Sequence, residues 1–154
     1  MKREPMSWEE CSAKHIRKVE IDTDKVNSIL KLCAVRLRVV KLIPLDAETA
    51  SVIAEHFYEI MKELLIALLL LHTIKSDNHE CLIAFFKKTY PEKEYETKVM
   101  YDLKAIRHKI DYEGLFVGKG YIERNRLEFI HIISFLQDEI QGTICFVSDG
   151  LAKR

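Results

Sequence analysis

The segment AEHFYEIMKELLIALLLL, residues 54–71, contains the longest apolar run of the chain and decides which folds are available. Its apolar residues recur every three or four positions, the spacing that puts side chains on one face of an α-helix. We predict a helix over roughly Asp46 to His72, whose buried face holds Ala50, Ile53, Ala54, Phe57, Met61, Leu64, Leu68 and Leu71. Toward Leu71 nearly every side is apolar, which is typical of a central bundle helix.

This helix is not predicted to enter a membrane. The uninterrupted run LLIALLLL, residues 64–71, is too short to span a bilayer, and Lys62 and Glu63 precede it directly. A helix lying on a membrane surface is an alternative, but the polar face carries charges of both signs rather than a basic bias. The pattern therefore favours a helix buried in a globular domain.

The composition indicates one helical domain. The 154 residues are enough for a core, 48% of them are hydrophobic, and glycine (5) and proline (3) are too scarce for the many turns of a β-sandwich or barrel. The 24 basic and 24 acidic side chains cancel, so the whole chain is not an electrostatic nucleic-acid binder. A local exception, Lys31 to Lys41 with Arg36 and Arg38 between them, could contact RNA phosphates or form a solvated face.

The cysteines indicate a reducing compartment. Cys11, Cys33, Cys81 and Cys145 are widely spaced without a CxxC pair, and the opening residues MKREPMSWEE are polar. This pattern predicts reduced thiols in a cytoplasmic protein.

Helix-capping residues and prolines divide the chain into six predicted helices. Ser7 with Glu10, and Asp77 with Glu80, match the capping-box pattern that starts a helix. Pro44 ends the second helix because proline disfavours helical geometry in the residue before it. The predicted helices cover roughly 8–18, 22 or 23 to 43, 46–72, 77–88, 92–112 and 121–140.

We therefore predict an all-α fold, an antiparallel bundle of five to six helices in one domain over 1–142. Residues 143–154 are predicted as a C-terminal tail. Its TICFV stretch, 143–147, is compatible with a short strand or an extended arm.

The helix over 92–112 has two stripes instead of one. The first, expected to face the core, consists of Tyr95, Val99, Leu103, Ile106 and Ile110. The second, on the opposite side, consists of Tyr101, Ala105, His108 and Tyr112. An ordinary surface helix has one such stripe, so this helix is predicted to pack on both sides. The second neighbour is another helix of the chain or the same helix of a second subunit; alternatively the aromatic residues are simply exposed.

Lys104, Arg107 and Asp111 share one flank of this helix between the stripes. Arg107 and Asp111 are four residues apart, so their side chains can meet. The flank is either a surface ion pair or an arginine held next to an interface and directed at a phosphate, a role that suits the planar guanidinium.

Three segments carry a resemblance to a known family: YDLKAIRHKIDYEG (101–114), YIERNRLEFIHIISFL (121–136) and AEHFYEIMKELLIALLLLHTIKSDNHECLIAFF (54–86). Together they resemble proteins of the HEPN superfamily (higher eukaryotes and prokaryotes nucleotide-binding) over roughly 46–140. The resemblance implies an antiparallel, commonly dimeric helical bundle. Many members of this family are toxins or defence proteins that cut RNA without a metal. Others are partners of small nucleotidyltransferases or non-catalytic nucleotide- or RNA-binding modules.

Catalytic members of that family have an arginine, a polar residue and, after four to six intervening residues, a histidine. Arg107 followed by His108 matches the first half, but the expected histidine window holds Tyr112, Glu113 and Gly114. A formal match, Arg124 or Arg126 with His131, lies inside the last predicted helix. There Arg126 and His131 diverge by about 140°, and Arg124 and His131 are two turns apart along the helix axis. The sequence therefore departs from the pattern at the position where ribonuclease chemistry would need its proton-transfer group.

The leading prediction is an RNA- or nucleotide-binding helical module, non-catalytic or weakly catalytic, paired with a nucleotidyltransferase in a toxin–antitoxin or defence system. The first alternative is a metal-independent endoribonuclease acting as a dimer, with Arg107 and His108 of two subunits meeting across the interface. The second is a structural dimerisation protein.

Residues 104–112 carry all the candidate roles except that of Tyr101. The candidate catalytic residues are Arg107 and His108. The candidate ligand-binding residues are Lys104, Arg107, Asp111 and Tyr112. The candidate interface residues are Tyr101, Ala105, His108 and Tyr112. No histidine pair has metal-ligand spacing, and the glycine-rich loop after Glu113 lacks the strand and Ser/Thr of a phosphate-binding loop, so neither a metal nor a cofactor is predicted. A homodimer without membrane association is predicted.

Overall fold

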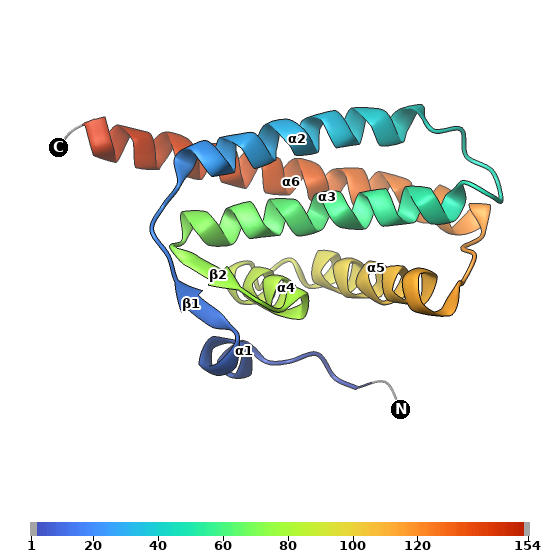
Figure 1. Ribbon diagram of the computed structural model, residues 1–154, viewed down its shortest axis with the longest axis horizontal. Helices are drawn as coiled ribbons and strands as arrows, with labels where there is room; N and C mark the ends of the chain where they lie inside the picture. Colours follow the sequence, from blue (N-terminus) through green and yellow to red (C-terminus); the bar gives the residue numbers. More distant parts are fainter. Residues whose placement is uncertain (1–2, 153–154) are drawn as a thin grey trace.

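The computed structural model describes residues 3–152, which form a helical bundle with one small two-stranded antiparallel sheet (Figure 1). In chain order the elements are α1 (Trp8–Lys14), β1 (Ile16–Lys18), α2 (Thr23–Leu42), α3 (Ala50–Leu71), β2 (Ile74–Ser76), α4 (His79–Thr89), α5 (Glu94–Glu113) and α6 (Lys119–Ala152). The predicted all-α bundle is confirmed. Long helices that follow one another along the chain alternate in direction, so α3 is opposed to α2 and α5 and runs parallel to α6. None of the helices within 3–152 is long and apolar enough to cross a membrane.

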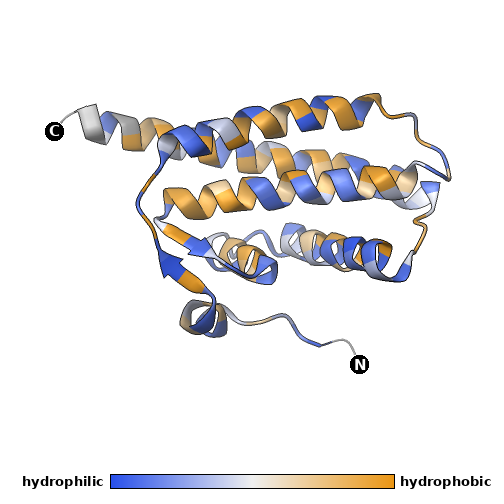
Figure 2. Cartoon of the chain, viewed as in Figure 1, coloured by the Kyte–Doolittle hydropathy of each residue, from blue (hydrophilic) through white to orange (hydrophobic). Residues whose placement is uncertain are grey.

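The predicted central position of α3 is confirmed. This helix packs against α2, α4, α5 and α6 and also contacts β2. Its C-terminal half is apolar nearly all round, as Figure 2 shows, and every residue from Ala67 to Leu71 is buried. Phe57 meets Phe129 of α6 with ring centroids 5.3 Å apart, and both rings are almost fully buried. The core of the protein is therefore organised around α3.

Side-chain caps mark the starts of α1, α2 and α4. Ser7 caps α1 and Asp22 caps α2, each accepting a hydrogen bond from a backbone N–H three residues later. The predicted capping box of Asp77 and Glu80 is wrong: Asn78 caps α4, and its side chain accepts from the Glu80 N–H at 2.9 Å. Asp77 is held by the sheet instead, because its N–H donates to the carbonyl of His15 and its carboxylate contacts the ring of His15 at 2.9 Å.

The predicted helix over 8–18 is too long. The helix ends at Lys14, and Ile16–Lys18 pairs antiparallel with Ile74–Ser76 as β1 and β2. Ile16 and Val19 are β-branched and suit extended backbone, but the pairing partner lies far along the chain and leaves no local signal. A tertiary contact thus overrides the helical pattern here.

The prediction of four reduced thiols is also wrong. Cys11 of α1 and Cys81 of α4 form a disulfide, with their Cα atoms 5.6 Å apart and both side chains fully buried. Cys33 and Cys145 are free. The absence of a CxxC pair excluded only a local bridge, whereas the packing of α1 on α4 brings together cysteines separated by 70 residues.

The C-terminal tail is helical, so the prediction of a strand or extended arm over 143–147 is wrong. Helix α6 continues to Ala152, across the domain boundary predicted after residue 142; residues 153–154 of the predicted tail lie outside the described part. Leu136, Ile140 and Ile144 are buried at four-residue intervals, so the buried face of α6 continues past Gly142. A single glycine costs a helix only about 1 kcal/mol, which this packing outweighs.

Replacing glycine with alanine should have opposite effects on the free energy of unfolding at Gly114 and at Gly142. Gly114 ends α5 at φ 65°, where a Cβ is strained, so Gly114→Ala should lower the free energy of unfolding by about 1 kcal/mol. Gly142 lies inside α6 with nothing within 4 Å of an added Cβ, so Gly142→Ala should raise it by roughly 0.5–1 kcal/mol. Urea unfolding of both variants checks this, and shifts of the same sign would contradict the two helix boundaries.

Candidate functional site

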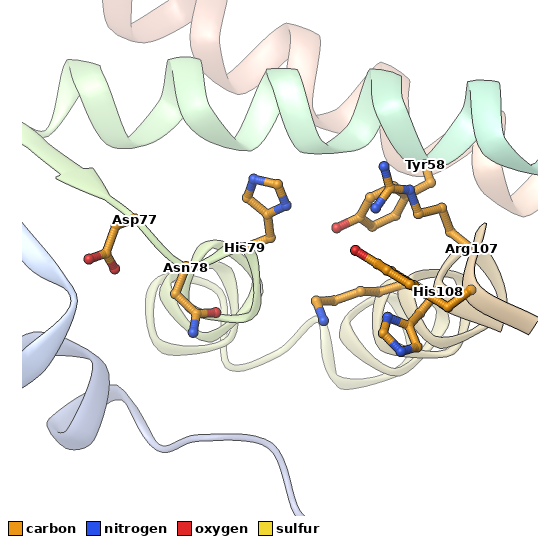
Figure 3. A pocket seen from close by; sticks show the side chains of 8 residues that line it. Tyr58, Asp77, Asn78, His79, Arg107 and His108 are labelled. Atoms are coloured by element: carbon orange, nitrogen blue, oxygen red, sulfur yellow. The ribbon is translucent and has the colours of Figure 1, made fainter. Parts of the chain in front are cut away.

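An open pocket of about 290 Å³ lies where α3, α4 and α5 meet (Figure 3). Its walls are polar and aromatic rather than apolar. The lining residues are Tyr58, Asp77, Asn78, His79, Lys104, Arg107, His108 and Tyr112. Four of these residues, from Lys104 to Tyr112, were candidates from the sequence, and the structure brings them together with groups from two other elements.

The surface pattern of α5 explains why its polar residues face this pocket. The helix buries Thr97, Met100 and Leu103 against its neighbours. The row that starts at Met100 continues at helical spacing through Lys104 and Arg107, which are half-buried. The buried side of the helix thus changes into a charged rim at the pocket. Tyr95 of the first turn of α5 is 60% exposed, so the prediction that it faces the core is wrong.

Arg107 is positioned by two contacts. Its Nε lies 3.0 Å from Oδ2 of Asp111, which confirms the predicted contact between these two side chains. Its guanidinium carbon lies 5.5 Å from the ring centroid of Tyr58, and Figure 3 shows the guanidinium against that ring. A guanidinium has five N–H donors, and the contact with Asp111 is made at the Nε end. The terminal nitrogens of Arg107 therefore remain available to an anion.

Tyr58 of α3 is a pocket residue that the sequence analysis missed. Burial raises its pKa to about 12, although the Arg107 cation opposes that shift. The hydroxyl therefore stays protonated near neutral pH. The Tyr58 ring forms the floor of the pocket, and Arg107 packs against it. This contact depends on how α3 and α5 pack together, so the sequence alone does not predict it.

His79, which the sequence analysis did not single out, lies in the pocket wall at the first turn of α4. Its pKa is lowered, first by partial desolvation and then by the cations Lys62 and Arg107, with a smaller effect of Lys104 against the opposing carboxylate Glu59. The imidazole is therefore neutral near pH 7 and can accept a proton. No sequence signal connects His79 to residues 104–112, because the two lie on different helices.

His108 and Tyr112 form an aromatic pair at the mouth of the pocket. Their ring centroids are 4.5 Å apart, and Tyr112 is 74% exposed. Ala105 is exposed as well, whereas Tyr101 is half-buried against the core. No other helix of the described chain covers Ala105, His108 and Tyr112, so an intrachain neighbour is excluded for this part of the second stripe. A second subunit there remains a prediction.

The alternative motif lies elsewhere. Arg124, Arg126 and His131 are all on α6, and none of them lines the pocket. The basic residues of α2 are likewise absent from its walls. Among the candidate sites predicted from the sequence, only the flank of α5 lies in this pocket, together with Tyr58 of α3 and His79 of α4.

A second concavity, of about 390 Å³, adjoins the first and shares Asp77 with it. Lys14, Arg17 and Lys75 line it together with His15. Arg17 and Lys75 are direct cross-strand partners of β1 and β2, an arrangement of like charges that destabilises a sheet unless an anion offsets it. Neither cation forms an ion pair with a residue in the described part of the chain.

Fold and site together define a class: an all-α bundle with a cationic, aromatic-lined pocket beside a small sheet that carries the paired cations Arg17 and Lys75. Residues 3–152 contain no cluster of three or more histidine, cysteine or carboxylate side chains arranged to hold a metal ion. Comparisons with protein-family models, with curated proteins and with solved structures give no match.

Proposed function

We propose that the pocket between α3, α4 and α5 binds single-stranded RNA. The observation that carries the proposal is the convergence of Lys104 and Arg107 on an open pocket whose mouth holds exposed aromatic rings. Arginine and lysine hold phosphate oxygens, and an unpaired base stacks on aromatic faces such as Tyr112. The flank predicted from the sequence supplies the charge, and Tyr58 and His79 complete the walls.

The neighbouring basic concavity at β1 and β2 favours an RNA strand over a single nucleotide as the ligand. A mononucleotide fills one pocket, whereas the cations Arg17 and Lys75, which are unpaired within residues 3–152, line the adjoining concavity beyond Asp77. Further phosphates of a strand would neutralise the opposed Arg17 and Lys75. The net charge of zero does not exclude this, because the positive charge is local.

We further propose that this module is non-catalytic or weakly catalytic and works with a nucleotidyltransferase partner in a toxin–antitoxin or defence pair. The resemblance to HEPN proteins supports that setting. The cytoplasmic location predicted from the sequence is part of the same proposal. Cytoplasmic thiols reduce most disulfides, but exchange requires access to a sulfur atom, and Cys11 and Cys81 are both fully buried.

Substitutions in the α5 flank test the RNA proposal. Fluorescence anisotropy with a labelled single-stranded RNA of roughly ten nucleotides should show affinity weakened by about tenfold in Arg107→Ala and in Lys104→Ala, because each removes a charge-assisted phosphate contact. Lys98→Ala is the matched control, since Lys98 is an exposed cation on the same helix outside the pocket. Equal affinities in all three variants would refute the site.

The lowered pKa of His79 predicts a pH dependence. A phosphate bound beside the imidazole favours its charged form, so RNA binding takes up a proton and should tighten as pH falls from about 8 to about 6. His79→Gln should remove part of this dependence. His108 lines the same pocket, so His108→Gln is measured in parallel. In the free protein the sign is opposite: the unfolded chain binds the proton first, so stability falls over that window. RNA affinity that weakens on acidification would contradict the placement of the phosphate.

The second candidate function is a metal-independent endoribonuclease acting as a dimer. The exposed stripe of Ala105, His108 and Tyr112 favours it, because a second subunit there would bring Arg107 and His108 of both copies to a shared cleft. Incubation with total RNA in excess EDTA tests this function. RNA cleavage that is lost in Arg107→Ala would support the nuclease, and RNA that stays intact at high protein concentration would exclude it.

Light scattering on the RNA-free protein tests the homodimer. A protein that forms a dimer but binds no RNA would support the remaining alternative, a structural dimerisation protein.

A further inference from the structure

The outward face of α2 carries an apolar stripe that no residue of the described chain covers. Leu32, Val35, Val39 and Leu42 are 49%, 36%, 47% and 77% exposed. Their spacing of three, four and three residues is the repeat found at helix–helix seams. At about 100° per residue the stripe spans about 80° and is centred about 140° round the helix from the residues buried against α3. Such a continuous exposed line marks an interaction surface rather than scattered exposed residues.

Basic side chains border this stripe. Lys31 and Arg38 are exposed on one side, and Arg36 lies on the other, with its NH1 nitrogen 3.6 Å from Oε1 of Glu59. Along its length α2 carries five basic residues and a single acidic one, Asp24 in the first turn. Pairing α2 with α2 of a second copy would place these cations against one another in either orientation. Like charges beside a seam weaken it, so the charge pattern disfavours self-association.

We propose that the stripe binds an acidic amphipathic helix of a partner protein. Apolar side chains of that helix would cover Leu32 to Leu42, and its carboxylates would meet Lys31 and Arg38. The geometry favours a helix over a membrane surface, because a seam about 80° wide is narrower than the apolar face of a surface-bound helix. The stripe also lacks the aromatic residues common in membrane-surface helices. No residue of α2 lines the RNA pocket, so this inference does not depend on RNA binding.

Two synthetic helical peptides test the proposal with the full-length protein. Both carry leucine at the seam positions; one has glutamate and the other lysine at the flanking positions. In fluorescence anisotropy the glutamate peptide should bind about tenfold or more tightly than the lysine peptide, with a difference that shrinks at high salt. Leu32→Ser with Val39→Ser should abolish most of this binding. The matched control Leu127→Ser removes an 80% exposed leucine from α6 and should leave it unchanged.

Charge reversal separates recognition from adhesion to an apolar surface. Lys31→Glu with Arg38→Glu should turn the preference toward the lysine peptide. Equal binding of both peptides, or binding of neither, would overturn the proposal. If light scattering shows a dimer, and Leu32→Ser with Val39→Ser abolishes that dimer, the stripe binds a second copy of the chain instead. Binding to phosphatidylserine vesicles lost in that variant would assign it to a membrane.

Discussion

Replacing Phe57 with alanine should lower the free energy of unfolding by about 4 kcal/mol, the largest loss expected from any single substitution discussed for this protein. Phe57 is 1% exposed, lies on the central helix α3 and packs against Phe129 of α6. Removing the ring loses its burial and leaves a cavity that the surrounding helices cannot close without moving. Urea unfolding followed by circular dichroism measures the change.

Phe116→Ala is the matched control, because Phe116 is 73% exposed in the loop between α5 and α6. It should change the free energy of unfolding by less than about 0.5 kcal/mol. If Phe57→Ala lowered the free energy of unfolding no more than Phe116→Ala, α3 would not be the centre of the core. The position of Tyr58, which lies on α3 and forms the floor of the pocket, would then be in question.

Removing the disulfide should have the second largest effect. The bridge spans 70 residues, and the chain-entropy model gives about 4 kcal/mol for closing a loop of that size. The double variant Cys11→Ala with Cys81→Ala avoids leaving an unpaired thiol, and Cys145→Ala controls for loss of an exposed thiol. Chemical unfolding of the two variants gives the difference directly.

The loss should appear first at the N-terminal end of the chain. Helix α1 packs on α4, and β1 pairs only with β2, so these elements have few other contacts to hold them. Hydrogen exchange should therefore speed up at β1 and β2 before it does at α3. An unfolding midpoint that reducing agent leaves unchanged would contradict a bridge between Cys11 and Cys81 in the native protein.

Features set by local chemistry were predictable from the sequence. The helical period of residues 54–71 predicts α3, and Ser7, Asp22 and Gly114 mark the helix ends where the structure has them. The features missed depend on partners far along the chain. Strand β1 exists through its pairing with β2, and the Cys11–Cys81 bond exists through the packing of α1 on α4. A period of 3.6 residues contains no information about either contact.

The candidate site divides in the same way. Lys104, Arg107 and Asp111 could be grouped because helical spacing alone places them on one flank, and the contact between Arg107 and Asp111 follows from it. Tyr58 and His79 belong to α3 and α4, and their position depends on how those helices pack against α5. The sequence therefore predicts one wall of the pocket, and the fold supplies the other two.

An NMR titration of the uniformly ¹⁵N-labelled protein with single-stranded RNA tests the central claim most directly, because it locates the ligand without any substitution. We expect the largest shifts at the backbone amides of residues 77–79 and 104–112, with smaller ones at β1 and β2. Shifts confined to the outward face of α2 or to α6, or none at RNA concentrations of about 1 mM, far above the dissociation constants of specific binders, would contradict the assignment of the pocket as an RNA site.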